Sequence, residues 1–218
     1  MKRIVIAGAT GLIGKQLVIA LAGQEEVESH ILVRRKPERV PTGVIVHEAA
    51  ATDWPTEVAA IKADIAISCL GTTMRTAGSK TAFRAVDFDL VADFASAAKA
   101  AGARHMIAVS SVGASDKASN FYLKTKGEAE AAMAHMGFDR VDFLRPGLLT
   151  GGERPENRPG ESVAIMLAPL TDLLMVGGLS RYRSIPALVV AQAIAHLALA
   201  GGQGKHIHEN DAIRALAG

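Results

Sequence analysis

The amino-acid sequence predicts an α/β protein built on one doubly wound parallel sheet with helices on both faces. Two observations lead to this fold class. Short apolar segments alternate with longer segments of helical pattern, which is the order that parallel strands and their crossover helices require. The first apolar segment also runs into GATGLIG, a glycine-rich turn from Gly8 to Gly14 that opens the first expected helix. Because such folds bind ligands at the carboxyl ends of their strands, we expect the site residues there.

The expected strands are three to six residues long and stop at glycine, proline or charged residues. Residues 2–7, KRIVIA, form an apolar run stopped by Gly8, as is typical of a strand buried on both faces. The second strand ends at the charged loop 34–37, the fourth at Gly71 and the sixth at residues 145–147. In chain order, the expected strands cover residues 2–7, 30–33, 44–47, 65–69, 105–109, 141–144 and 206–208.

The expected helices lie between these strands. The alanine-rich helix over residues 84–101 ends before Gly102, and the next helix ends before Gly137, since glycine commonly terminates a helix. Residues 151–160, GGERPENRPG, predict a loop, with its arginines Arg154 and Arg158 either in solvent or facing an acidic substrate. In chain order, the expected helices cover residues 12–22, 54–61, 84–101, 122–136, 161–174, 186–200 and 211–216.

Length and composition favour one domain, 1–218, with a cofactor-binding core over 1–147 and a small substrate-covering C-terminal part over 148–218. The net charge of +2 gives no reason to expect nucleic acid as a partner. No apolar stretch reaches the roughly 20 residues that a membrane helix needs. The single cysteine, Cys69, excludes an internal disulfide, and glycines interrupt the apolar N-terminus where a signal peptide would be continuous. We therefore expect a cytoplasmic protein, monomeric or homodimeric, that acts on a small molecule.

The glycine turn predicts a dinucleotide site. Gly8, Gly11 and Gly14 permit a tight turn, close approach to a pyrophosphate and close packing of helix on strand. The N–H groups at the helix start then point at the phosphates. Other cofactor-binding residues expected in the same turn are Thr10, Leu12 and Ile13. The alternative is a turn that only joins strand to helix.

Residues after the second, third and fourth expected strands are also expected to contact the cofactor. Arg34 and Arg35 stand where an acidic residue would select NAD, so they favour the 2′-phosphate of NADP; the alternative is a solvated basic loop. Asp53 follows the third strand, where it would accept a hydrogen bond from adenine or cap the helix at residues 54–61. Leu70, Gly71 and Thr72 end the fourth strand, where the ribose would pass, and Cys69 beside them is interpreted as a buried apolar residue.

A serine, a tyrosine and a lysine form the candidate catalytic set. Tyr122 and Lys126 are four residues apart and so share a helix face, where the ammonium would favour the ionised phenol. Such a phenol, close to a serine hydroxyl, can donate a proton to a carbonyl that receives hydride. Tyr122 and Lys126 are also both expected to contact the cofactor, with Lys126 holding its ribose. Ser111 is the expected serine, although Ser110 beside it is an alternative and both could simply satisfy loop backbone. A metal site at His206 and His208 is not expected, since no nearby acidic or cysteine partners have ligand spacing.

These motifs resemble the short-chain dehydrogenase/reductase superfamily, and more narrowly its atypical branch, the Tat-interacting protein family. The more specific stretches are GATGLIG, CLGTT at 69–73, SSVGASDKASNFYLKTKGEAE at 110–130 and FLRPGLL at 143–149. The resemblance implies a Rossmann-like fold, NADP as cofactor, and a nicotinamide lined by Pro146, Gly147, Leu148 and Leu149. One departure is Asp87, which stands about where many superfamily members carry an asparagine of the proton relay.

The sequence thus predicts an NADP-dependent oxidoreductase acting on a small carbonyl or alcohol. A non-catalytic NADP-binding regulatory or redox-sensing protein is the alternative. Nucleotide-sugar epimerisation is a third interpretation, for which the roughly 70 residues after Pro146 leave little room. The substrate is expected to enter a pocket bounded by Ser111, Tyr122 and residues 148–162, whose stretch 151–160 would act as a flap.

Overall fold

The computed structural model describes residues 1–151, 175 and 177–218. Seven strands form one sheet in the order β3-β2-β1-β4-β5-β6-β9, and every neighbouring pair in it is parallel. This order, with its reversal between β1 and β4, confirms the predicted doubly wound, Rossmann-like fold. The strands are β1 (Lys2–Ala7), β2 (Val27–Val33), β3 (Val44–Glu48), β4 (Ile65–Ser68), β5 (His105–Val109), β6 (Arg140–Leu144) and β9 (Gly204–His208).

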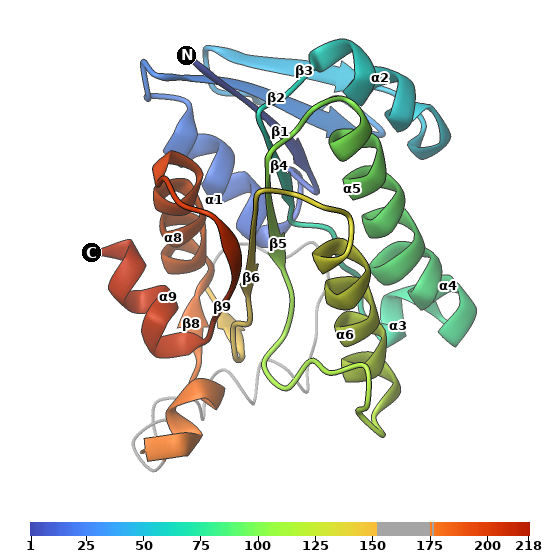
Figure 1. The fold of residues 1–218 in the computed structure, drawn as a ribbon, viewed down its shortest axis with the longest axis vertical. Helices are drawn as coiled ribbons and strands as arrows, with labels where there is room; N and C mark the ends of the chain where they lie inside the picture. Colours follow the sequence, from blue (N-terminus) through green and yellow to red (C-terminus); the bar gives the residue numbers. More distant parts are fainter. Residues whose placement is uncertain (152–174, 176) are drawn as a thin grey trace.

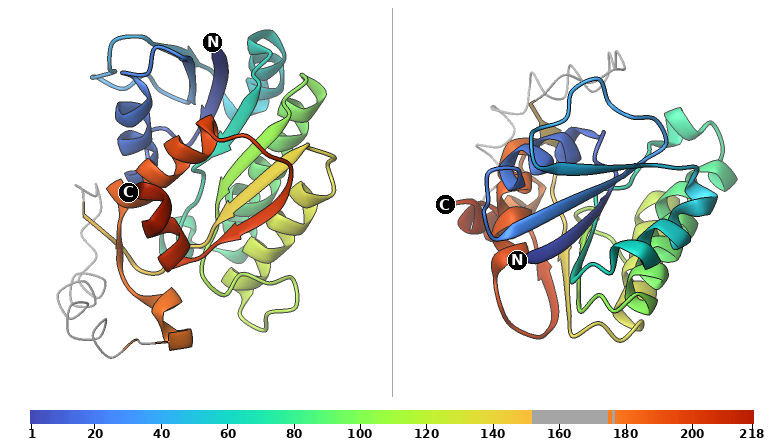
Figure 2. Two further views of the ribbon diagram at one scale, coloured as in Figure 1. Left: turned by 60° about the vertical axis from the view of Figure 1, so that its left-hand side comes forward. Right: turned by 90° about the horizontal axis from the view of Figure 1, so that it is seen from above.

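Helices cover both faces of the sheet, as Figures 1 and 2 show. Against one face lie α1 (Leu12–Leu21), α8 (Ala187–Leu199) and α9 (Asn210–Ala217). Against the other lie α2 (Trp54–Ile61), α5 (Leu90–Ala100) and α6 (Phe121–Ala134). Each face has its own apolar core, because strands buried on both sides send alternate side chains to opposite faces.

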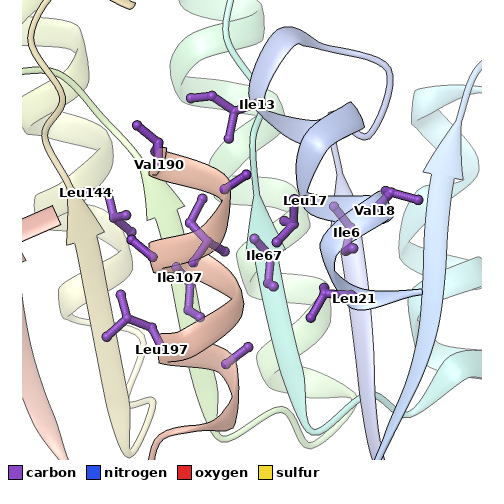
Figure 3. Packing of buried hydrophobic residues seen from close by; sticks show 14 of the residues in the cluster. Ile6, Ile13, Leu17, Val18, Leu21, Ile67, Ile107, Leu144, Val190 and Leu197 are labelled. Atoms are coloured by element: carbon purple, nitrogen blue, oxygen red, sulfur yellow. The ribbon is translucent and has the colours of Figure 1, made fainter. Parts of the chain in front are cut away.

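The core beneath α1 and α8 joins the two ends of the chain. Leu17 and Leu21 of α1 and Val190 and Leu197 of α8 pack over Ile107 and its neighbours in the sheet (Figure 3). The Lys2 ammonium donates to the carbonyls of Ala198 and Leu199 at the end of α8, where a cation also meets the negative end of the helix dipole. The C-terminal elements are therefore part of the same sheet and core as the first strand.

The helix expected over residues 84–101 is longer and less regular than predicted. It begins as α4 (Lys80–Arg84), widens into a π-helical turn, η2 (Ala85–Asp89), and continues as α5. Ser79 caps its start by accepting a hydrogen bond from the Ala82 N–H. A short helix before it, α3 (Met74–Ala77), was not expected. A π turn carries one extra residue, so it changes the direction in which the side chains of its residues point.

Smaller elements complete the described chain. Two short strands, β7 (Leu149–Thr150) and β8 (Ile185–Pro186), pair in parallel apart from the main sheet, and were also not predicted. Two short 3₁₀ helices are η1 (Ala51–Asp53) and η3 (Gly177–Tyr182). The helix expected at 161–174, and residues 152–160 of the expected loop with Arg154 and Arg158, lie outside the described residues. No helix in the described ranges has the length and apolar character to cross a membrane.

Candidate cofactor and catalytic site

The glycine turn lies at the switch point of the sheet, between the ends of β1 and β4. Gly8 has φ +82° and its α-carbon faces the backbone of Cys69 and Leu70, where a Cβ would lie 2.5 Å from the Cys69 carbonyl carbon. A Cβ on Gly14 would lie 2.2 Å from the Gly8 oxygen. Both glycines are therefore required for three backbone segments to meet: the turn, the first helix and the loop after β4.

The N-terminus of α1 is open at this turn. In the described part of the chain no side chain caps it. The first helical hydrogen bond runs from the Lys15 N–H to the Gly11 oxygen, so the N–H groups before Lys15 in the first turn of α1 are not used by the regular bonding of the helix. Thr10 and Gly11 are exposed, whereas the side chain of Ile13 is buried in the core. Ile13 thus offers a cofactor only its backbone.

Arg34 and Arg35 lie where the sequence predicts them, directly after β2. Both are exposed, and together with Thr10 they line a cleft of about 580 Å³. The cleft therefore brings the end of β2 and the glycine turn together around two guanidinium groups. Guanidinium groups bind phosphate through paired, charge-assisted hydrogen bonds, so the cleft suits an anionic group beside the open helix end.

Asp53 does not cap α2 as the sequence analysis allowed. It stands at the N-cap position, but its backbone is already helical and its side chain makes no capping bond among the described residues. The Thr52 hydroxyl donates to it instead. Asp53 is exposed, so its carboxylate remains available to a ligand, and its predicted contact with adenine stays a prediction.

The loop after β4 holds Cys69, Leu70, Gly71 and Thr72. Burial raises the pKa of the Cys69 thiol to about 12, which leaves it protonated and unreactive at neutral pH. Gly71 is exposed, so a ligand can approach its backbone. The Thr72 N–H is already used, since it donates to the Asp87 carboxylate at 2.8 Å.

The two serines after β5 differ in environment. Ser110 is buried, and its hydroxyl has no hydrogen-bond partner among the described residues. Ser111 is half-buried, and its hydroxyl makes only a long contact, 3.5 Å, to the Val112 oxygen. Both hydroxyls can therefore accept a new partner, and the choice of Ser111 remains a prediction.

Tyr122 is held by the packing of α4 against α6. It is the second residue of α6, whose start is capped by Asn120. The ring of the fully buried Phe83 lies 5.5 Å from the Tyr122 ring, centroid to centroid, and also packs edge-on against Phe121. An ion pair between Arg84 and Glu128 joins the same two helices. These contacts fix the ring of a half-buried tyrosine at the start of α6.

Lys126 lies one turn further along α6 and is buried. Its ammonium nitrogen is 2.8 Å from Oδ1 of Asp87, in an ion pair rather than a well-directed hydrogen bond. No hydrogen bond links Lys126, Tyr122 and Ser111 to one another in the described chain. The catalytic roles of Ser111, Tyr122 and Lys126 therefore stay predictions, and Asp87 is a direct partner of Lys126 that the site prediction did not include.

Residues 146–148 form the loop after β6, and Leu149 begins β7. The Val112 N–H donates to the Pro146 oxygen, which ties this loop to the serine loop. The α-carbon of Gly147 faces the backbone of Tyr182 and Arg183, where a Cβ would lie 2.3 Å from the Arg183 oxygen. Gly147 is therefore needed for the packing of these two segments, and the contacts of 146–149 with nicotinamide stay a prediction. Of the predicted substrate pocket, residues 152–162 lie outside the described residues.

No group of three or more histidine, cysteine or acidic side chains in the described ranges could hold a metal ion. His208 does have an acidic partner, contrary to the sequence analysis: it binds Asp142, 66 residues away, at 2.7 Å. Its sequence neighbours could not indicate this contact, because β9 pairs with β6 only in the folded sheet.

The model of a family described as NAD(P)H-binding matches residues 8–164, which is more than half of the chain. Among curated proteins, HTATIP2 of Rattus norvegicus is 34% identical over 219 residues, covering 97% of this chain and 88% of its own length. The chain is an atypical short-chain dehydrogenase/reductase related to HTATIP2. The resemblance drawn from the sequence motifs is confirmed.

Fungal members of this family correct one prediction. FMP52 of Coccidioides immitis, named a mitochondrial protein, is 32% identical and covers 98% of this chain and 92% of its own. The FMP52 of Candida albicans, also named mitochondrial, is 34% identical over 73% of this chain and 72% of its own. The predicted cytoplasmic location is therefore wrong, because it conflicts with the names of these relatives. One cysteine and a small net charge do not distinguish one reducing compartment from another.

Solved structures agree with the fold. The UDP-glucose 4-epimerase of Thermus thermophilus, in a complex with NAD, has a TM-score of 0.71 at 16% identity and covers 99% of this chain and 81% of its own. The oxidoreductase ylbE of Lactococcus lactis has a TM-score of 0.67 at 22% identity and covers 98% of this chain and 96% of its own. At such identities the likeness concerns the fold alone.

Proposed function

We propose that this protein is an NADP-dependent oxidoreductase that moves hydride between nicotinamide and a small carbonyl or alcohol. The observation that carries the proposal is the cleft lined by Thr10, Arg34 and Arg35 beside the open N-terminus of α1. Gly8 and Gly14 leave the backbone bare there, as a bound pyrophosphate requires. The residues present therefore fit a dinucleotide with a third phosphate.

Bound NADP would supply or accept the hydride. In the reductive direction, the Tyr122 phenol donates a proton to the substrate oxygen as that oxygen gains negative charge. Ser111 donates a hydrogen bond that orients the same oxygen. The Lys126 ammonium places a positive charge one turn from the phenol and favours its ionised form when the proton leaves. Phe83 keeps the tyrosine ring in place throughout.

The choice of cofactor is tested by calorimetric titration of NADPH and NADH. NADPH is expected to bind more tightly, and Arg34→Ala should weaken NADPH about 10- to 100-fold while sparing NADH, since a hydrogen bond to a charged group contributes about 1.5–3 kcal/mol. Arg39→Ala is the matched control, because it removes the same charge from the same exposed loop. Equal affinity of the unmodified protein for both cofactors would overturn the assignment to NADP.

Catalysis is tested by NADPH oxidation across a broad panel of carbonyl compounds. For any substrate found, Tyr122→Phe should lower turnover about 100-fold or more with NADPH affinity nearly unchanged, because the phenol acts in the transition state. Tyr182→Phe, which alters the other tyrosine of the chain, should leave turnover unchanged. A Tyr122→Phe variant that turns over substrate at the wild-type rate would contradict the mechanism. Tight NADPH binding with no turnover on any compound would favour a regulatory NADP-binding role.

A further inference from the structure

The contact between Asp87 and Lys126 joins two groups that are both removed from water. The Asp87 side chain is 0% exposed and the Lys126 side chain 8% exposed, and 2.8 Å separates the ammonium nitrogen from Oδ1. The other carboxylate oxygen accepts the Thr72 N–H at 2.8 Å. One aspartate therefore holds both the catalytic lysine and the loop after β4 that the cofactor would meet.

A buried ammonium without a partner is unfavourable, and it releases its proton at a lower pH than one in water. In the described chain Asp87 is the sole carboxylate in an ion pair with Lys126. The other acidic groups on the elements around Lys126 are paired or in solvent. Glu128 pairs with Arg84, Glu130 pairs with Arg145, and Asp142 binds Arg140 and two histidines. Asp89 and Asp93 are both exposed. Other titratable groups on these elements are the Tyr122 phenol four residues earlier on α6, the Cys69 thiol in the loop before Gly71, and Asp116, which is exposed in the segment that packs against α6 at Gly127. Among the described residues, Asp87 is therefore the carboxylate that compensates the charge on Lys126.

The local backbone explains how an aspartate reaches this position. Asp87 is the middle residue of the π turn η2, and such turns are frequent at functional sites. Gly71 leaves room for the contact, because a Cβ there would lie 3.4 Å from the Lys126 nitrogen and 3.5 Å from Oδ1 of Asp87. The ammonium thus lies beside Gly71, on the side where a larger residue would place its Cβ.

We propose that Asp87 is a positioning residue that keeps the buried Lys126 protonated and fixes its ammonium against the Gly71–Thr72 turn. The proton stays on Lys126 because the carboxylate compensates its charge, and the turn stays in place because Thr72 donates to the same carboxylate. The effect on cofactor binding rests on the proposed function, whereas the effect on the lysine itself does not.

The first experiment needs neither cofactor nor substrate. Urea unfolding of Asp87→Asn is compared with the wild type between about pH 7 and pH 10; the asparagine oxygen can still accept from Thr72, so the change removes mainly the charge. In the variant, folded Lys126 loses its proton below the pH of about 10.4 at which unfolded lysine does. The unfolded state then binds more protons, so the variant gains stability as the pH rises. Its urea midpoint should be well below the wild type near neutral pH, and the gap should shrink by about half or more toward pH 10.

Glu128→Gln is the matched control, because it also removes a carboxylate from an ion pair that involves α6, here the pair of Glu128 with Arg84 of α4, and leaves the pair of Lys126 with Asp87 intact. Its deficit should be constant over the same pH range. A second variant, Asp87→Asn with Lys126→Met, removes both charges and should regain most of the urea midpoint that Asp87→Asn loses. It also provides the test if Asp87→Asn alone does not fold, because the double variant should then fold. A pH-independent deficit for Asp87→Asn, or no recovery in the double variant, would overturn the proposal.

The second experiment measures NADPH affinity against pH by calorimetry. Wild-type affinity should change little up to about pH 9, while Asp87→Asn should lose affinity progressively over that range as Lys126 gives up its charge. Asp87→Glu keeps the carboxylate and should restore most of the wild-type pH dependence. In the proposed function Lys126 also holds the cofactor ribose. If unfolding behaves as expected but both proteins show the same binding profile, Asp87 holds Lys126 as proposed, and it is this contact of Lys126 with the cofactor that fails.

Discussion

At the turn after β1, two glycines allow backbone segments to pack closely against each other. A side chain at either position would push these segments apart and destabilise the fold. Gly8 lies against the backbone of residues 69–70, and Gly14 of α1 lies against Gly8. Atoms of the main chain cannot rotate away as a flexible side chain can. The fit of a dinucleotide to this turn therefore depends on missing β-carbons as much as on any functional group.

Gly14→Ala is expected to destabilise the protein by about 1–3 kcal/mol or more, because its Cβ would overlap the Gly8 oxygen. On helix propensity alone the change would stabilise α1 by about 1 kcal/mol. The sign of the change in unfolding free energy therefore shows whether steric overlap or helix propensity is the larger effect. Gly23→Ala is the control, since no atom lies within 4 Å of the position that its Cβ would take. Urea unfolding measures both, and a Gly14→Ala protein as stable as the wild type would contradict the close packing.

Some of the predicted site residues carry local sequence signals, and the structure gives their places in the fold, while their roles stay predictions. Arg34 and Arg35 line the cleft with Thr10, and Tyr122 and Lys126 lie one turn apart on α6. Asp87 was noted only as a departure from the superfamily pattern. Its contacts to Lys126 and Thr72 join positions 39 and 15 residues away, and no local spacing encodes them.

At the scale of elements, Asp142 of β6 connects three neighbouring strands. It accepts hydrogen bonds from His105 of β5, from His208 of β9 and from Arg140 of its own strand. Burial alone would raise the pKa of Asp142, but the hydrogen bonds from these three side chains outweigh it and hold the pKa well below the usual range. The carboxylate is fully buried, so it contributes to the fold only while it is ionised and paired.

Asp142→Asn is expected to destabilise the protein by about 3–5 kcal/mol near neutral pH, as removal of one partner from a buried pair does. Because the folded-state pKa is depressed, the wild-type advantage is full above the ordinary carboxyl pKa of about 3.9 and is lost as the pH falls below it. Urea unfolding from about pH 7 down to pH 3 should therefore show the two proteins converging in acid. A constant difference over that range would mean that Asp142 is not the ionised centre of this cluster.

Element positions followed from apolar runs and glycine or proline boundaries, since the parallel sheet needs short buried strands. The expected α2 agrees with the structure at both ends, and β2 begins three residues before the expected strand. The π turn within residues 85–89 was missed, because no glycine, proline or other break in the sequence pattern marks it.

At the scale of the whole molecule, the C-terminal elements complete the sheet and close one core. β9 is the last strand beside β6, and α8 packs beside α1 over the same strands (Figure 3). The division of the chain into a cofactor-binding core, 1–147, and a covering part, 148–218, remains a prediction. It can be decided by asking whether the first part folds alone.

A chain ending at residue 150 is expected not to form a stable fold. It lacks α8 and α9, whose Val190, Ile194, Leu197 and Ile213 are fully or almost fully buried. Burial of each such side chain contributes about 1.5–3 kcal/mol, so the loss of roughly 6–12 kcal/mol approaches the whole stability of an ordinary domain. The loss would also uncover the apolar face of α1 that follows the glycine turn, so NADPH should not bind.

Circular dichroism during urea unfolding and calorimetry with NADPH would test this expectation. The control is a chain ending at residue 209, which lacks only α9 and should remain folded with a lowered urea midpoint. If the chain of 150 residues instead unfolds cooperatively and binds NADPH, residues after it form an addition to a self-sufficient nucleotide-binding unit. The packing of α8 on α1 argues against that result, because the helix that would receive the phosphates is itself held from behind by the C-terminal part of the chain.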